Sequence, residues 1–212
     1  TSLTYFPIRG RAETPRLILE HVGEKYEDVR IQMADWPSKK SSFPFGQLPF
    51  YKDSDVEMPQ SIAIVRHLGR KHGLYGDSLA EQAQVDVVID TVNDGMTAVM
   101  GQFNEKFHGG DRSGVEEAIE KAMGNISKLL KDNDFFVGNK VSVADFAVFH
   151  VIDNYVKPLH APSLAANEAI ENFRKRVAAL PNIAAYLASD RRPAITMPPF
   201  FKVLCTPEEC KQ

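Results

Sequence analysis

The sequence predicts a mixed α/β domain followed by an all-helical domain. Residues 1–76 contain short β-prone segments that alternate with amphipathic segments, and Pro and Gly residues separate them. Residues 81–204, in contrast, show helical periods and almost no strand pattern. An order of β-α-β segments is typical of a mixed sheet with helices packed on it. We therefore expect domains over 1–76 and 81–212, joined by a linker over 77–80.

Local signals define each element expected in the first domain. Residues 3–6 form an apolar β-prone run that ends at Pro7 and Gly10. Residues 12–22 carry apolar positions at near-helical spacing, and Gly23 is expected to end that helix. The remaining elements are a strand at 26–31, a hairpin with strands at 48–51 and 56–58, and a helix that Ser61 caps and Gly73 ends.

Apolar stripes predict the helices of the second domain. Residues 85–103 and 115–130 each place apolar side chains three or four positions apart. A third stripe begins at Ser142 and a fourth near Phe173. No internal repeat and no low-complexity stretch interrupts this part of the sequence.

Composition indicates a globular chain whose main partner is not a nucleic acid. Hydrophobic residues make up 43% and charged residues 25%, and no apolar run approaches the roughly 18 residues of a membrane span. The net charge of −3 argues against nucleic acid binding. Residues 1–76 carry +2 and residues 77–212 carry −5, which makes the first domain the better place for an anionic ligand; chance variation is the alternative interpretation. Two cysteines, Cys205 and Cys210, are too few for a disulfide framework and favour a reducing, cytoplasmic location.

Several common catalytic signatures are absent from the sequence. It contains no G-x-S-x-G, H-E-x-x-H, G-x-G-x-x-G or Walker A motif. The six histidines are scattered without metal-ligand spacing, and we interpret each as a surface or capping residue. We therefore expect no metal site.

A tyrosine at the end of the first strand is the first candidate for chemistry. The segment Tyr5-Phe6-Pro7-Ile8-Arg9-Gly10-Arg11 leads from that strand through a tight turn into a helix. Such a position places the hydroxyl of Tyr5 at the sheet edge where open α/β sheets bind ligands. A half-buried strand tyrosine without a chemical role is the alternative.

Two further segments offer backbone groups to a ligand. If the Leu48-Pro49 bond is cis, the bend leaves the N–H and C=O of Leu48 free for an extended peptide, although most X–Pro bonds are trans. The segment Pro59-Gln60-Ser61 begins a helix, so its free N–H groups and positive dipole end could hold a carboxylate. Capping by Ser61 is compatible with that role.

An acidic stripe lies on the first helix of the second domain. Asp86, Asp90 and Asp94 are four residues apart and share one helix face, where like charges repel. A solvated acidic face is one interpretation. The other is that cations meet this face, and Arg66 and Arg70 could supply them.

These segments, in this order, resemble those of the cytosolic glutathione transferases over nearly the whole chain, and together they are highly specific. The matching segments are Tyr5-Phe6-x-x-Arg9-Gly10-Arg11-Ala12-Glu13, Asp35-Trp36-Pro37-x-x-Lys40, Phe45-Gly46-Gln47-Leu48-Pro49, Gln60-Ser61-x-Ala63-Ile64 and Arg66-His67-Leu68-Gly69-Arg70. Ser142-Val143-Ala144-Asp145-Phe146 resembles the family's capping box. The resemblance is to the Tyr-type, pi/sigma-like group. It implies a thioredoxin-like first domain, an all-helical second domain and a homodimer.

The resemblance also implies a role for each matching residue. Tyr5 would donate a hydrogen bond to the sulfur of glutathione, and Arg11 would support the charge. The other implied glutathione-binding residues are Trp36, Lys40, Gln47, Leu48 before a cis Pro49, Gln60, Ser61 and, reaching across the dimer, Asp94. Arg66 and Arg70 would meet Asp86 and Asp90 of the partner subunit.

Thiol chemistry gives this resemblance a physical basis. A free thiol has a pKa near 8.5, and lowering it by about two units takes about 2.7 kcal/mol of preferential anion stabilisation. Hydrogen bonds to charged groups contribute about 1.5–3 kcal/mol, so a placed O–H donor can supply much of this. The candidate lining of an adjoining electrophile pocket is Phe6, Ile8, Met96, Met100, Phe103, Asn104 and Phe107. Asn104 stands near a position where pi-class proteins carry a Tyr, so their electrophile specificity does not transfer to this chain.

The sequence therefore predicts a glutathione transferase that conjugates hydrophobic electrophiles in detoxification. A glutathione-dependent isomerase, similar to a prostaglandin synthase, is the first alternative, because it would use the same thiolate. A non-catalytic ligand-binding or structural protein on the same scaffold is the second, and the presence of Tyr5 and Arg11 argues against it.

Overall fold

A four-stranded mixed sheet forms the first part of the chain. The structure is a computed structural model that describes residues 1–103, 112–131 and 133–196. The sheet has the order β2-β1-β3-β4. β1 (Ser2–Tyr5) pairs in parallel with β2 (Glu27–Arg30) and antiparallel with β3 (Phe50–Lys52), which pairs antiparallel with β4 (Glu57–Pro59). The predicted mixed sheet is confirmed.

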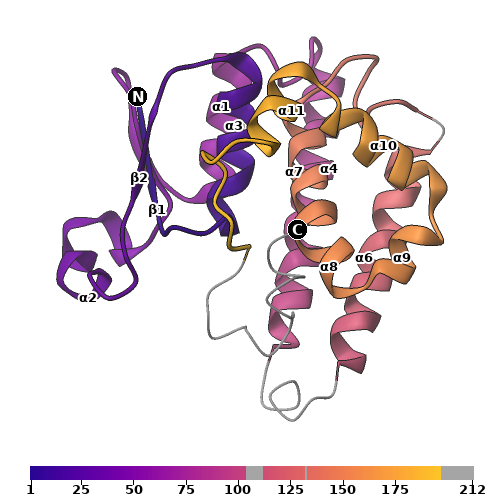
Figure 1. The fold of residues 1–212 in the computed structure, drawn as a ribbon. Coiled ribbons are helices and arrows are strands. Elements are labelled where there is room, and N and C mark those ends of the chain that lie inside the picture. The colour runs from indigo at the N-terminus through magenta and orange to yellow at the C-terminus, as the bar shows by residue number, and fades with distance from the viewer. Residues whose placement is uncertain (104–111, 132, 197–212) are drawn as a thin grey trace.

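Two amphipathic helices, α1 (Glu13–Val22) and α3 (Ser61–Lys71), lie between this sheet and the helical part (Figure 1). α1 ends at Gly23, whose φ of 70° is in the left-handed region, as the sequence predicted. The prediction that Ser61 caps α3 is wrong. Gln60 holds the cap position without a side-chain bond, and Ser61 is already the first helical residue. The short helix α2 (Trp36–Lys39) lies on the other side of the sheet (Figure 1).

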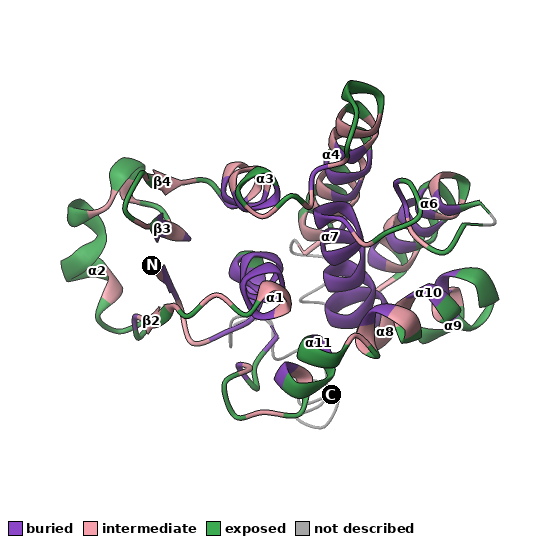
Figure 2. Ribbon diagram, turned by 90° about the horizontal axis from the view of Figure 1, so that it is seen from above, coloured by how far each residue is buried: buried purple, intermediate pink, exposed green. Residues whose placement is uncertain are grey.

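The described residues of the second part form helices and connecting loops, with no strand among them. Its helices are α4 (Leu79–Gly101), α6 (Ser113–Leu130), α7 (Val143–Val151), α8 (Lys157–Leu159), α9 (Ala161–Ala165), α10 (Glu168–Ala178) and α11 (Pro181–Leu187). One π-helical turn, η4 (Ile152–Val156), continues α7. α7 is buried along its whole length and occupies the centre of the molecule (Figure 2). The apolar stripes therefore face one common core.

A capping box starts the central helix, as predicted. The carboxylate of Asp145 accepts bonds from the backbone N–H of Ser142 at 2.7 Å, from the Ser142 hydroxyl at 2.8 Å and from the backbone N–H of Phe136 at 2.9 Å. Burial nevertheless raises the pKa of Asp145 to about 6. The box thus fixes both the start of α7 and the loop before it.

The last described segment returns to the first part of the chain. The backbone N–H groups of Arg9 and Gly10 donate to the carbonyls of Ile195 and Thr196 at 2.8 and 3.2 Å. The Arg9 side chain donates to the carbonyl of Pro193 at 2.9 Å. We call residues 189–196 the strap, because they bind the turn that follows β1. No helix among the described residues is long and apolar enough to cross a membrane.

The arginines predicted to reach a partner subunit have partners within their own chain. Arg66 Nε lies 2.7 Å from Asp86 Oδ1, and Arg66 Nη2 lies 2.6 Å from Asp90 Oδ1. The guanidinium of Arg70 lies 4.3 Å from the centre of the Tyr75 ring. Only residues 72–78 separate α3 from α4, so this short connection brings the arginine of one helix to the aspartates of the next. Within one chain, Arg66 thus pairs with Asp86 and Asp90, and the predicted contacts of Arg66 and Arg70 with a partner subunit stay a prediction.

Candidate active site

Tyr5 is held at the end of β1 by the turn that follows it. The backbone N–H of Arg11 donates to the Tyr5 hydroxyl oxygen at 3.2 Å. Gly10 lies directly beneath the ring with φ of +40°, and a Cβ there would stand 2.8 Å from the hydroxyl oxygen. Only glycine fits this position, both because of the left-handed backbone and because of the close approach.

The hydroxyl of Tyr5 remains a proton donor. Burial raises its pKa, and the bond from the Arg11 backbone and the Arg11 and Arg16 charges offset this only in part. The side chain is therefore a phenol at neutral pH. Because its oxygen already accepts the Arg11 N–H, its own proton is available to an acceptor outside the turn.

A groove of about 590 Å³ runs along the sheet edge beside Tyr5. Every glutathione-binding residue predicted from the resemblance except Lys40 and Asp94 lines it. The complete lining is Tyr5, Phe6, Arg11, Trp36, Gly46, Gln47, Leu48, Pro49, Gln60 and Ser61. Residues from four separate segments of the chain thus meet at one place.

Two backbone features shape this groove. The Leu48-Pro49 bond is cis, as the resemblance implied. Gln60 has φ of 74°, a left-handed conformation that is uncommon for a residue other than glycine. Its side-chain nitrogen donates to Gln47 Oε1 at 3.3 Å. Such strained residues cluster at ligand-binding sites. Gln60 and Ser61, which line the groove, stand at the N-terminus of α3, and the first N–H groups of a helix have no partner within the helix.

Contacts between aromatic rings support one wall of the groove. The Phe6 ring lies 5.5 Å from Trp36 in an edge-to-face arrangement, and Trp36 lies 5.8 Å from Phe43. Lys40 is exposed, but its aliphatic chain covers Gly46, where a Cβ would lie 3.0 Å from Lys40 Cε. Its ammonium group can therefore reach the groove's rim. Asp94 is exposed on α4 and lies outside the groove lining, so its contribution across a dimer stays a prediction.

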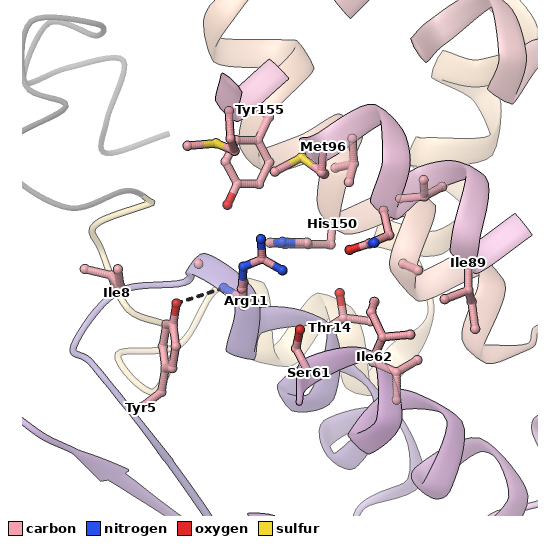
Figure 3. Close-up of a pocket in the computed structure, with 17 residues that line it drawn as sticks. Tyr5, Ile8, Arg11, Thr14, Ser61, Ile62, Ile89, Met96, His150 and Tyr155 are labelled. Atoms are coloured by element: carbon pink, nitrogen blue, oxygen red, sulfur yellow. Dashed lines mark hydrogen bonds between the residues drawn. The ribbon is translucent and has the colours of Figure 1, made fainter. Parts of the chain in front are cut away.

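A second, more apolar cavity of about 290 Å³ adjoins the first (Figure 3). Tyr5, Arg11 and Ser61 line both, so the tyrosine hydroxyl lies where the two meet. Ile8, Met96 and Met100, three of the residues predicted for the electrophile pocket, line it. The junction of a polar groove and an apolar cavity allows a thiol on one side to meet an apolar partner on the other.

The other residues predicted for the electrophile pocket lie elsewhere. Phe6 lines the polar groove instead, because it comes directly after β1 and its ring packs against Trp36. Phe103 packs on the core and is outside the cavity lining. Asn104 and Phe107 lie outside the described residues.

Sequence reasoning missed most of the cavity wall. The missed residues are Gly10, Thr14, Ile62, Val65, Ile89, Val92, Asn93, Ala147, His150, Val151 and Tyr155. Ala147, His150 and Val151 follow helical spacing on α7 and could have been read as one face. The interpretation of every histidine as a surface or capping residue is wrong for His150, which is 7% exposed.

The described residues hold no cluster of His, Cys, Asp and Glu that could bind a metal ion. The expectation of a metal-free site stays a prediction. Cys205 and Cys210 lie outside the described residues.

Comparisons with known proteins agree with this geometry. The model "Glutathione S-transferase, N-terminal domain" matches residues 1–70, and "Glutathione S-transferase, C-terminal domain" matches residues 89–190. The hematopoietic prostaglandin D synthase of Gallus gallus is 37% identical over 91% of this chain and 98% of its own. A glutathione S-transferase of Dirofilaria immitis is 35% identical over 92% and 95%. The solved pi-class glutathione S-transferase of Onchocerca volvulus has a TM-score of 0.81 at 32% identity over 88% and 91%. The chain therefore belongs to the glutathione S-transferase family, in its pi/sigma-like part.

Proposed function

We propose that this chain activates the thiol of glutathione with the hydroxyl of Tyr5 and conjugates the thiolate to hydrophobic electrophiles. The observation that carries the proposal is the position of that hydroxyl. It accepts from the Arg11 backbone, keeps its own proton and stands where the polar groove meets the apolar cavity. The proton can therefore be donated to a sulfur anion placed at that junction.

The groove provides complementary groups for a doubly acidic tripeptide. Gln60 and Ser61, at the N-terminus of α3, would take the γ-glutamyl carboxylate, where free N–H groups and the helix dipole favour an anion. Trp36, Lys40 and Gln47 would hold the glycine end, and Leu48 the cysteinyl backbone. Arg11, which lines both cavities, would support the thiolate charge.

The remaining parts of the proposal rest on the resemblance. They are a homodimer in which Asp94 reaches the partner's glutathione amine, and a role in detoxification. The cytoplasmic location is proposed from the low cysteine content, and the domain limits at 1–76 and 81–212 from the change in sequence periodicity. The apolar cavity supports the hydrophobic character of the electrophile.

Substitution of Tyr5 by Phe tests the proposal. We expect the pKa of enzyme-bound glutathione thiol to rise by about one to two pH units, because a hydrogen bond to a charged group contributes about 1.5–3 kcal/mol. Ultraviolet absorption of the thiolate during a pH titration measures this directly. Tyr155→Phe is the matched control, since it removes a second hydroxyl from the same apolar cavity. Equal thiolate titrations for wild type and Tyr5→Phe would contradict the role of Tyr5.

A glutathione-dependent isomerase is the second candidate, because the Gallus gallus relative is named as a prostaglandin D synthase. Both activities start from the same thiolate. A panel with an aryl halide, an alkenal, an organic hydroperoxide and a prostaglandin endoperoxide separates them. Absence of thiolate at neutral pH in the wild type would instead favour a non-catalytic binding protein.

A further inference from the structure

His150 is a buried histidine in the wall of the apolar cavity, and the proposed thiol chemistry does not use it. It lies on α7 with 7% of its surface exposed, and its ring stands edge-on to Tyr155 at 5.4 Å. The imidazole extends from α7 into the space between Arg11, Met96 and Tyr155 (Figure 3). It therefore faces the same cavity as the hydroxyl of Tyr5.

The contacts of Asn154 determine which ring nitrogen of His150 carries a proton. Arg9 Nη1 and Arg192 Nη2 lie 3.0 and 3.2 Å from Asn154 Oδ1. A guanidinium has donors only, so the amide atom that faces both arginines is the oxygen. The amide nitrogen then faces His150 and donates to Nδ1 at 2.7 Å. Because Nδ1 accepts this bond, the neutral ring carries its proton on Nε2.

The ring stays neutral in this environment. Burial lowers the pKa of His150 to about 3, and the charges of Arg192, Arg9, Arg16 and Arg11 act in the same direction. Nε2 has no hydrogen-bond partner within the part of the chain that the structure describes. Nε2 is not among the buried atoms left without a partner, so solvent in the cavity reaches it, and an acceptor on a ligand would take the place of that solvent beside the apolar walls.

We propose that His150 determines electrophile specificity: its Nε2–H is a fixed hydrogen-bond donor in the apolar cavity that selects electrophiles with a carbonyl oxygen conjugated to the reacting carbon. This inference rests on the proposed conjugation of glutathione. The fixed tautomer presents a donor and no acceptor, so an oxygen that gains negative charge during the reaction is the matching group. An α,β-unsaturated ketone or aldehyde has such an oxygen.

The chemical step balances without any further reactant. The glutathione thiolate forms a bond to the β-carbon of the enone while the π electrons of the C=C bond move onto the carbonyl oxygen. The Nε2–H of His150 donates to this enolate oxygen and keeps its proton. The α-carbon then takes a proton from water, which replaces the proton that the thiol lost, and the saturated ketone adduct results.

Product binding tests the inference without relying on turnover. S-(3-oxobutyl)glutathione and S-butylglutathione differ by one ketone oxygen, and calorimetry gives the ratio of their dissociation constants. We expect the wild type to prefer the ketone by about tenfold or more, the range of a satisfied buried donor. His150→Leu should bring the ratio close to one, and His150→Gln, which restores an N–H near the same place, should recover part of it. Thr14→Val, which alters another polar residue of the cavity wall, should keep the wild-type ratio.

The outcomes separate this inference from the proposed function. Binding of glutathione alone with no ketone preference in the wild type overturns the role of His150 and leaves the proposed function standing. An unchanged preference in His150→Leu, or its loss in Thr14→Val alone, also overturns it. Failure of the wild type to bind glutathione at all refutes the proposed function and this inference with it. A kinetic companion is the ratio of kcat/KM for methyl vinyl ketone to that for benzyl chloride, which should fall in His150→Leu by about tenfold to a hundredfold.

Discussion

We expect substitution of Arg192, a residue of the strap, by Met to lower the free energy of unfolding strongly. Arg192 is largely buried and donates to Glu13 Oε1 and Asp153 Oδ2, both at 2.8 Å, and to Asn154 Oδ1 at 3.2 Å. Its removal leaves the fully buried carboxylate of Glu13 with the Tyr186 hydroxyl at 3.2 Å and Arg16 at 3.7 Å.

The size of this stability loss follows from the buried negative charge of Glu13, which would lose its closest cationic partner. Breaking a buried pair by removal of one partner costs about 3–5 kcal/mol. Because Arg16 and the Tyr186 hydroxyl still face Glu13, we expect the lower end of that range, about 3 kcal/mol. Urea unfolding followed by far-ultraviolet circular dichroism measures it, and the midpoint should fall while the slope stays constant.

Arg191 provides a matched control in the same segment. Its side chain is 60% exposed, and it bonds Glu20 at 2.7 Å from the solvent side. Arg191→Met should cost about 1 kcal/mol or less, as exposed pairs do. Equal losses in the two variants would refute the reasoning. A Glu13→Gln, Arg192→Met double variant should lose less than the sum of the single losses, because each single change leaves a charge buried.

Two further predictions follow from the site. As the pH falls from 6.5 toward 3, the wild type should lose stability relative to His150→Gln, by about 2 kcal/mol at pH 5. The reason is that His150 takes up a proton in the unfolded chain, whereas in the folded chain its pKa is lowered to about 3. Parallel pH profiles of the two proteins in urea unfolding would contradict this. Gly10→Ala should reduce the conjugation rate at least about tenfold, because the new Cβ displaces the Tyr5 hydroxyl that lies 2.8 Å from it. Gly73, with φ of +67° and open space around it, is the control, and Gly73→Ala should affect only stability. Equal activity losses in the two variants would show that backbone strain alone is responsible.

Local signals explain how much of the fold the sequence could predict. The strand before Pro7, the helix end at Gly23 and the capping box at Ser142 each depend on residues within a few positions of one another. The predicted cap of α3, Ser61, was one residue too late, since the structure places Gln60 at the cap. The left-handed backbone of Gln60 depends on its surroundings in the groove and has no local sequence signal.

The polar half of the site was predicted better than the apolar half. Motif resemblance placed Trp36, Gln47 and Gln60 in one groove, because a motif preserves the spacing of residues that meet a common ligand. The apolar wall contains no such motif. An apolar residue such as Met96 gives the same helical pattern whether it fills a core or faces a cavity. Only the packing of neighbouring helices decides which of the two occurs.

Charge pairing shows the same limit. The sequence shows that Arg66 and the aspartates of α4 are complementary, since their charges and helical spacing are visible directly. It does not show whether they meet within one chain or between two, because that depends on how closely α4 follows α3 in space.

The sequence by itself thus determined the two-part architecture and the tyrosine at the strand end through local periodicity and spacing, and the residues of the polar groove through resemblance to a known family. Only the tertiary structure decided that Arg66 pairs within its own chain and that residues 193–196 bind the turn beside Tyr5. It also decided that His150 is a neutral donor facing the cavity, since two arginines distant in sequence orient the amide of Asn154 beside it. Contacts between segments so far apart depend on the packed geometry of the whole molecule, which no local pattern contains.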